Sequence, residues 1–183
     1  MNRKALVLLL VVLVALPTMS LAKDLTQKFA LGFSTSDAPV GIRYWAAEKV
    51  ALDLGLGFQS QEVADPEGEA GETTNTMSFW IDLGVPYKVV DFERAHFFVR
   101  PGALIALLDD RAYGSGGLDE TWTVINFNLG LGAEVFLTDQ FSVDAMHGFI
   151  VRYTSPPDDI GDSTTDFGTF GASITEVGFH FYF

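Results

Sequence analysis

The three histidines, His96, His147 and His180, are the residues whose type comes closest to acid–base or nucleophilic chemistry. A serine hydroxyl becomes a nucleophile only when an imidazole base lies next to it. None of the three histidines has a serine two residues away, and the sequence contains no cysteine. A packed or interfacial histidine explains each position more simply, so we predict no catalytic residue and no enzymatic activity.

Clustered carboxylates could bind a hard cation such as Ca²⁺. They occur in two polar stretches, the second of which contains Asp158, Asp159, Asp162 and Asp166. Their spacing does not follow the EF-hand pattern, which needs ligands at alternate positions and a glycine at the sixth. We therefore interpret both stretches as solvated loops, and we predict neither a metal site nor any other cofactor.

A third set of charged residues stands at alternate positions of otherwise apolar or glycine-rich segments: Arg43, Asp53, Asp82, Arg100, Asp144, Arg152 and Glu176. If these segments are neighbouring antiparallel strands, Arg43 and Asp53 lie at a similar height because they flank a short connection. Arg100 and Asp82 flank the next short connection in the same way. Since bare charges in a narrow interior are costly unless they are paired, we hypothesise an interior filled by ion pairs.

The segments that carry these charges are predicted to be β-strands, because apolar and polar residues alternate along them with a period of two. Eight segments show the alternation: 28–34, 40–45, 51–59, 77–88, 97–107, 125–135, 141–153 and 176–183. The sequence therefore predicts an all-β fold with eight antiparallel strands joined by hairpins.

The lengths of the connections alternate between short and long. Short connections are 46–49, 89–95 and 137–140, and long polar ones are 61–75, 109–119 and 154–168. The connection 35–39 is short where this rule predicts a long one. All the short turns would then lie at one end of an up-and-down sheet, which is typical of a transmembrane β-barrel.

The first 22 residues have the features of a secretory signal peptide. A positive start precedes an apolar run at 5–16, and the small residues Ser20 and Ala22 fit a cleavage site. The run is short for a spanning helix, which takes about 20 residues. We assign 1–22 to the signal peptide and 23–183 to one barrel domain, with a retained membrane anchor as the alternative.

The net charge of −13 at pH 7 excludes nucleic acid as a partner, because phosphate binding needs lysine and arginine. No apolar run after the signal peptide approaches 18 residues, so only a closed barrel could cross a membrane. Two exported alternatives remain. A lipocalin-like barrel buries its apolar face, whereas a transmembrane barrel turns that face towards lipid.

The composition of the polar phase favours the transmembrane barrel. It is rich in glycine, for example at Gly55, Gly57 and Gly130. Glycine weakens an exposed strand, whereas the interior of a narrow eight-stranded barrel has room mainly for small residues. Aromatic residues near the ends of the apolar phase, such as Tyr44 and Phe58, fit the girdles at the two membrane interfaces.

The final segment places Phe179, Phe181 and Phe183 on one face, with Phe183 last. This pattern resembles the C-terminal assembly signal of outer-membrane β-barrels, which implies recognition by the barrel-assembly machinery.

The chain from 25 to 183 resembles the small eight-stranded OmpA/OmpX-type family. The stretches "GIRYWAAEKVALDLGLGF" and "LGAEVFLTDQFSVDAMHGF" look like its strand–turn–strand units. Pro101 within a strand and His147 on the lipid-facing phase depart from the pattern.

We expect a monomer, because a closed barrel leaves no strand edge to pair. The resemblance implies the outer membrane of a Gram-negative-type bacterium, in contact with lipid and lipopolysaccharide. We predict a non-enzymatic barrel with a plugged, ion-paired lumen and acidic extracellular loops, whose partner the sequence does not identify. Its role would be structural or one of surface interaction. The alternatives are a narrow pore for ions or small solutes, a lipid A-modifying enzyme and a soluble lipocalin-like carrier.

Overall fold

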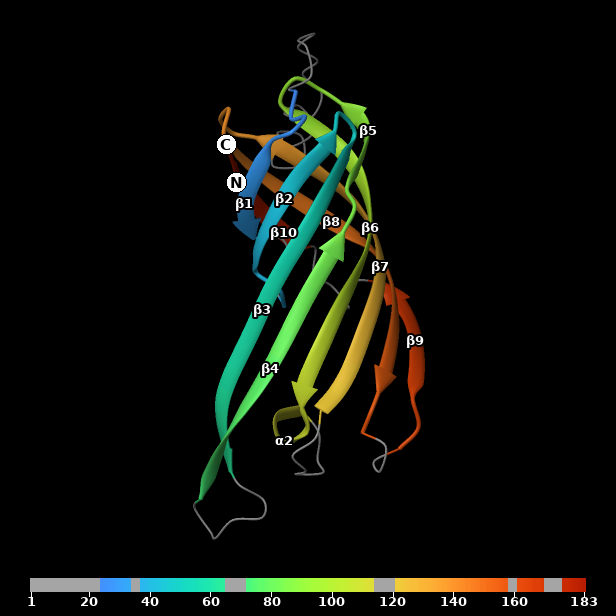
Figure 1. The fold of residues 1–183 in the computed structure, drawn as a ribbon. Coiled ribbons are helices and arrows are strands. Elements are labelled where there is room, and N and C mark those ends of the chain that lie inside the picture. Colours follow the sequence, from blue (N-terminus) through green and yellow to red (C-terminus); the bar gives the residue numbers. More distant parts are fainter. Residues whose placement is uncertain (1–23, 34–36, 65–71, 114–120, 158–160, 170–175) are drawn as a thin grey trace, which may run out of the picture.

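The described part of the chain forms one antiparallel β-sheet that closes on itself as a barrel (Figure 1). The computed structural model describes residues 24–33, 37–64, 72–113, 121–157, 161–169 and 176–183. The predicted signal peptide, 1–22, lies outside these residues. No helix in this part of the chain is long and apolar enough to cross a membrane.

The described residues contain ten strands and one helical turn. The strands are β1 Phe29–Phe33, β2 Val40–Ala47, β3 Val50–Ala64, β4 Thr73–Gly84, β5 Tyr87–Asp91, β6 Ala95–Asp109, β7 Thr121–Phe136, β8 Phe141–Ser155, β9 Thr164–Thr169 and β10 Glu176–Tyr182. The helical turn, α2 Asp110–Tyr113, follows β6. The barrel closes because β10 pairs with both β8 and β1.

Two strands of the barrel wall are each interrupted once. β4 and β5 follow each other along the chain and both pair with β6. β9 and β10 both pair with β8, at different heights. If each of these pairs is counted as one strand, the barrel has eight strands in up-and-down order, which confirms the predicted fold class.

The interruption between β4 and β5 lies at Val85 and Pro86. Proline has no amide hydrogen, so it cannot donate to a strand ladder. The backbone groups beside this interruption still form hydrogen bonds. The Val85 amide donates to the Pro101 carbonyl and the Ala51 amide donates to the Pro86 carbonyl, both at 2.9 Å. Pro101 itself stays within β6, opposite Leu129 of β7.

The strands extend further into the polar connections than the sequence predicts. The stretch 154–168 is predicted to be a loop, but β9 begins at Thr164 and pairs with β8. Its β-branched threonines suit a strand, and the Phe167 ring stacks on Phe149 with centroids 6.1 Å apart. β3 and β4 likewise pair as far as Ala64 and Thr73, because the ladder is made by backbone groups that polar residues also carry.

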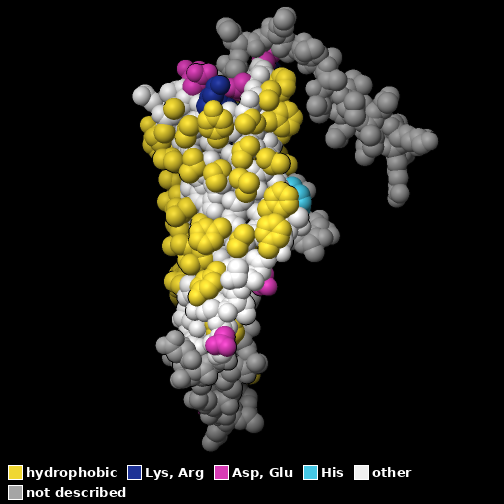
Figure 2. Space-filling model, turned by 90° about the vertical axis from the view of Figure 1, so that its right-hand side faces the viewer, with side chains coloured by type: hydrophobic (Ala, Val, Ile, Leu, Met, Phe, Trp, Pro, Cys, Tyr) yellow, Lys and Arg dark blue, Asp and Glu magenta, His cyan; other side chains and the backbone are white. Residues whose placement is uncertain are grey.

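Apolar side chains point outwards from the barrel and charged ones point inwards. Figure 2 shows hydrophobic side chains over the outer wall, with basic and acidic groups gathered near one end. Phe58, Phe127 and Phe179 are exposed, whereas Arg43 is only 2% exposed. A soluble barrel has the reverse arrangement, with its apolar face inside.

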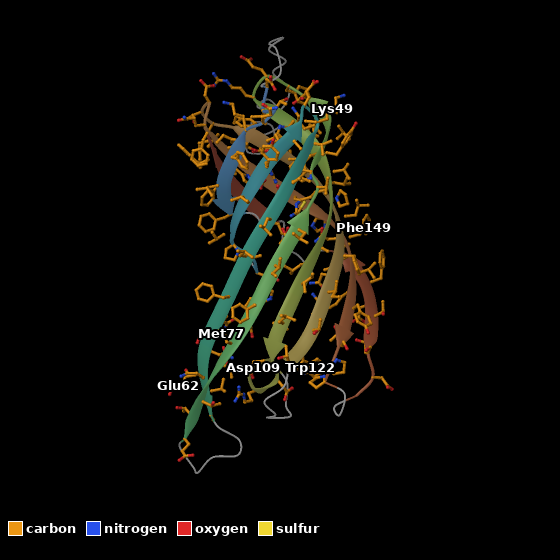
Figure 3. The ribbon with its side chains drawn as sticks, in the orientation of Figure 1. Lys49, Glu62, Met77, Asp109, Trp122 and Phe149 are labelled. Carbon is orange, nitrogen blue, oxygen red and sulfur yellow. The ribbon has the colours of Figure 1, made fainter. Side chains whose placement is uncertain are left out.

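The short turns lie at one end of the barrel. Lys49, which lies in the turn between β2 and β3, is at this end, and Glu62, Asp109 and Trp122 are at the other (Figure 3). We call the first end the turn end and the second the loop end. At the turn end, a small buried apolar cluster inside the barrel includes Leu25, Trp45, Phe136 and Tyr182.

Candidate functional site

Five of the predicted inward-facing charges meet in one buried network near the turn end, centred on Arg43 of β2. Arg43 lies opposite Asp53 of β3 in the strand register. Its Nε and Nη2 atoms donate to the two oxygens of Asp53 at 2.7 and 3.0 Å. This bidentate geometry is the strongest arrangement of a guanidinium and a carboxylate.

Arg100 of β6 continues the network on the other side of Asp53. Its Nε atom donates to Asp53 Oδ2 at 2.8 Å, and its Nη2 atom donates to Asp82. Asp82 lies opposite Leu104 in the register, so Arg100 and Asp82 are not directly opposite each other as the sequence suggested. The side chain of Arg100 reaches Asp82 by lying over Gly84, where a Cβ atom would collide with the guanidinium.

Glu134 of β7 is the acidic centre of the network, although it is not among the interior charges predicted from the sequence. It has no exposed surface. Its oxygens accept from Arg43 Nη1 at 3.0 Å, from the Tyr182 hydroxyl at 2.8 Å and from the Ser142 hydroxyl. The Nε2 atom of His96 lies 3.0 Å from the same carboxylate.

The polar phase of β7 holds the signal that could have identified Glu134. Glu134 follows Gly130 and Gly132 on the inward face of β7, and it is the one acidic residue of that strand. Its arginine partner is 91 residues away in the sequence and lies on a strand that does not neighbour β7. The rule of pairing across a short turn therefore could not find it.

Asp144 of β8 joins the network from another side of the lumen. Its Oδ2 atom lies 3.4 Å from Arg43 Nη1 and 3.4 Å from His180 Nδ1. A Cβ atom at Gly178 would collide with Asp144, so glycine is needed where β10 passes this carboxylate. Arg43 thus contacts three carboxylates that come from three strands.

A second layer closes the lumen on the turn-end side of Arg43. Trp45 Nε1 lies 3.3 Å from the hydroxyl oxygen of Tyr182. The ammonium of Lys88 pairs with Asp91 at 2.8 Å and lies over the Trp45 ring, 5.1 Å from its centroid. Cation–π contacts of this kind are favourable, more so when they are desolvated.

Two of the predicted interior charges lie outside the network. Arg152 of β8 donates to Asn126 Oδ1 at 3.0 Å and has an exposed side chain. Glu176 of β10 is partly buried, and no ion pair joins it to another residue in the described part of the chain. Both stand further towards the loop end than the Arg43 layer.

The network leaves almost no free space at its own level. A cavity bounded by Arg43, Phe98, Arg100, Asp144 and Met146 measures only about 10 Å³. That is about the smallest space that can hold a single water molecule. The Phe98 ring lies under the Arg43 guanidinium, 5.7 Å from centroid to Cζ. These five side chains therefore leave little free space between them.

The arrangement does not support nucleophilic catalysis. Ser142 lies opposite His180 in the register, but its hydroxyl donates to Glu134 and it has no exposed surface. His147 points out of the barrel, away from the network. No group of three or more histidine, aspartate or glutamate residues that could hold a metal occurs among the described residues.

Comparisons with known proteins add little to this geometry. No protein-family model matches the chain, and no curated protein sequence matches it. A crystal structure of a major outer membrane protein from Thermus thermophilus is 18% identical over 85% of this chain and 98% of that chain, with a TM-score of 0.31. A likeness at that level carries no functional inference.

The fold and its interior define the class of protein. It is a closed eight-stranded β-barrel with an apolar exterior and a charged, ion-paired interior. Barrels of this kind are suited to a bilayer, because closure leaves no strand edge unpaired in lipid.

Proposed function

We propose that the protein is a non-enzymatic integral outer-membrane β-barrel whose lumen is plugged by the Arg43 network. Its role is structural or one of surface interaction, carried by the acidic connections at the loop end. The chain is exported by the signal peptide 1–22. It is folded by the barrel-assembly machinery through the outward rings of Phe179, Phe181 and Phe183, and it works as a monomer of the OmpA/OmpX type.

The main support for a plugged lumen is the convergence of three carboxylates on Arg43. One guanidinium contacts Asp53, Glu134 and Asp144, which come from three strands. These contacts cross the lumen from β2 to β7 and β8, so they fill the path that a solute would take. An eight-stranded barrel is only just wide enough for its own side chains.

The outer wall supports the membrane location. Apolar residues such as Leu54, Phe127 and Leu129 are exposed along it, an arrangement that is unfavourable in water and favourable in lipid. Aromatic rings lie towards the turn end as an interfacial girdle would require. Phe29 stacks on Tyr44 with centroids 4.4 Å apart.

A narrow pore for ions or small solutes is the second candidate, and a specific observation favours it. Three buried polar atoms beside Arg100, namely Asp82 Oδ1, Arg100 Nη1 and Asn128 Oδ1, have no hydrogen-bond partner among the described residues. Buried polar atoms of this kind are commonly satisfied by water. Waters at these three atoms would form part of a polar path past Arg100.

Heat-dependent gel mobility tests the membrane-barrel part of the proposal. A transmembrane barrel keeps its fold in detergent until it is boiled, so boiled and unboiled samples should migrate differently. Identical migration, together with failure to insert into liposomes, would support the lipocalin-like alternative instead. Assays for lipid A deacylation should show no activity. Bilayer conductance then separates the plugged barrel from the pore.

A further inference from the structure

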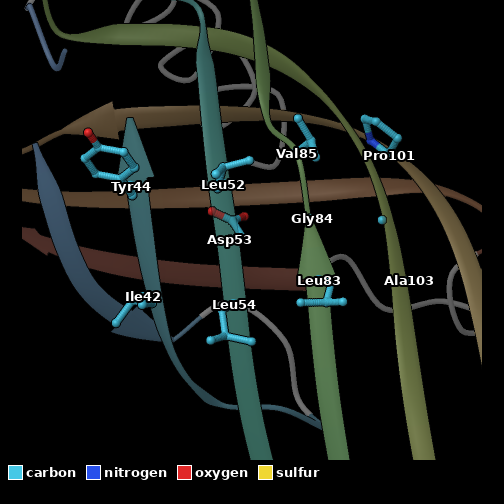
Figure 4. A pocket seen from close by; sticks show the side chains of 11 residues that line it. Ile42, Tyr44, Leu52, Asp53, Leu54, Leu83, Gly84, Val85, Pro101 and Ala103 are labelled. Carbon is cyan, nitrogen blue, oxygen red and sulfur yellow. The ribbon is translucent and has the colours of Figure 1, made fainter. Parts of the chain in front are cut away.

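The outer wall contains an apolar trench where β4 is interrupted. It has a volume of about 650 Å³ and crosses four neighbouring strands, β2, β3, β4 and β6 (Figure 4). Two rows of outward side chains form its sides. The row nearer the turn end is Tyr44, Leu52, Val85 and Pro101, and the other is Ile42, Leu54, Leu83 and Ala103.

The floor of the trench is low because the register places residues there with no outward side chain. Asp53, Gly84 and Gly102 lie side by side on β3, β4 and β6. Asp53 points inwards, where Arg43 and Arg100 hold its carboxylate. A Cβ atom added at Gly84 or Gly102 would also point inwards, towards Arg100, so the floor between the two outward rows consists of backbone.

We propose that this trench seats one acyl chain of a glycerophospholipid, whose phosphate is held at the turn end by Lys49. The proposal rests on the membrane location given under the proposed function. It adds a specific lipid site to a barrel that would otherwise contact lipid only non-specifically.

The lining determines the chemistry of the occupant. All eight side chains of the two rows are apolar or, for Tyr44, aromatic with one polar tip. The one charged residue at the floor is already paired on the inner side of the wall. The floor and the long sides of the trench therefore offer no charged group to an occupant. Its volume lies in the range of small-ligand sites, which is sufficient for a single acyl chain.

Lys49 provides the charge that a phosphate needs. It is exposed in the turn that joins β2 and β3, two of the strands that carry the trench. Lys49 is three residues from Leu52 along β3, which places it roughly 10 Å beyond the turn-end row of the trench. Lipid phosphates lie outside the hydrocarbon core, and basic residues at that level attract them. The tyrosine at that end of the trench suits the same interface.

Native mass spectrometry tests the site directly. The folded barrel is released with a mild detergent from liposomes of phosphatidylethanolamine and phosphatidylglycerol, and the bound mass is measured. We expect one phospholipid to remain on the wild-type barrel. Ala103→Phe, which fills the trench, should abolish retention. Val135→Phe, which adds the same ring to the outer wall of β7 away from the trench, should leave retention unchanged.

A second pair of variants tests the phosphate contact. Lys49→Gln should lower the retained fraction roughly fivefold, whereas Lys28→Gln, which removes another exposed cation of the turn end, should not lower it. Equal retention by Ala103→Phe and Val135→Phe would overturn the site. A retained mass equal to a second copy of the chain would also overturn it, because the trench would then be a dimer interface.

Failure of the lipid site can be told apart from failure of the membrane assignment. Each variant is first checked for heat-dependent gel mobility and for insertion into liposomes. A barrel that inserts but retains no lipid contradicts the trench proposal alone. A chain that does not insert contradicts the proposed function, and the trench proposal with it.

Discussion

Arg43 and Asp53 face each other across β2 and β3 and share two hydrogen bonds of 2.7 and 3.0 Å. Asp53 also accepts from Arg100 at 2.8 Å, so one carboxylate connects the two guanidiniums of the lumen. This shared acid makes the plug a continuous network and not a set of separate pairs. In a network of this kind, the loss of one member is expected to lower the stability by more than the loss of a single contact would.

Removal of Arg43 should be the most damaging single change in the lumen. Arg43→Ala leaves Glu134 and Asp144 without their guanidinium partner, and it leaves Asp53 with Arg100 alone. Breaking a buried pair on one side costs about 3–5 kcal/mol. We expect a lower denaturant midpoint for unfolding in detergent, followed by the loss of the faster-migrating gel form.

The control for Arg43 is Arg152→Ala. Arg152 is also on the polar phase of its strand, but it is exposed and bonds only to Asn126 among the described residues. Its removal should shift the midpoint far less. Equal shifts for the two variants would contradict the central position of Arg43 in the network.

Gly84→Ala should disturb the plug without removing any charge. The added Cβ atom would collide with the Arg100 guanidinium and displace it from Asp82 and Asp53. Overpacking of this kind typically costs about 1–3 kcal/mol. The measurement is the free energy of unfolding in detergent micelles. Gly168→Ala on β9 is the matched control, because nothing lies within 4 Å of its Cβ position.

Tyr182→Phe should weaken the turn-end side of the plug. The hydroxyl donates to Glu134 at 2.8 Å and contacts Trp45 Nε1 at 3.3 Å. Loss of this group leaves buried polar atoms unsatisfied, at a cost of about 1–3 kcal/mol. Tyr87→Phe on the outer wall should have little effect. A fall in stability no larger than that of the control would show that the hydroxyl does not hold the plug.

Phe183→Ser tests the assembly signal separately from the fold. The Phe183 amide donates to the Phe29 carbonyl at 3.0 Å, and a side-chain change leaves that bond in place. We expect refolding from urea into detergent to proceed normally, while the amount assembled in the outer membrane of cells falls. Phe149→Ser is the control for the loss of a ring elsewhere on the wall. An equal fall for both variants would argue against a terminal signal.

The period-two alternation is sufficient to predict the barrel and the face that most residues occupy. Short turns also place Arg43 beside Asp53, because a hairpin fixes the register of the residues near it. The alternation places Glu134 on the inward face, but its pairing with Arg43 escapes prediction because the two residues meet across the lumen, and strand-to-strand rules contain no information on contacts through the interior. β9 escapes prediction because the apolar phase of that stretch holds little beyond Phe167.

Single-channel conductance of the folded protein in a planar bilayer tests the plugged lumen most directly. Insertion is confirmed separately, by protease protection in liposomes made from the same lipid. The Arg43 network predicts a silent bilayer for the wild-type barrel and conductance steps for Arg43→Ala wherever that variant still inserts. Steady, reproducible steps from the wild-type protein would contradict the plug and establish the pore.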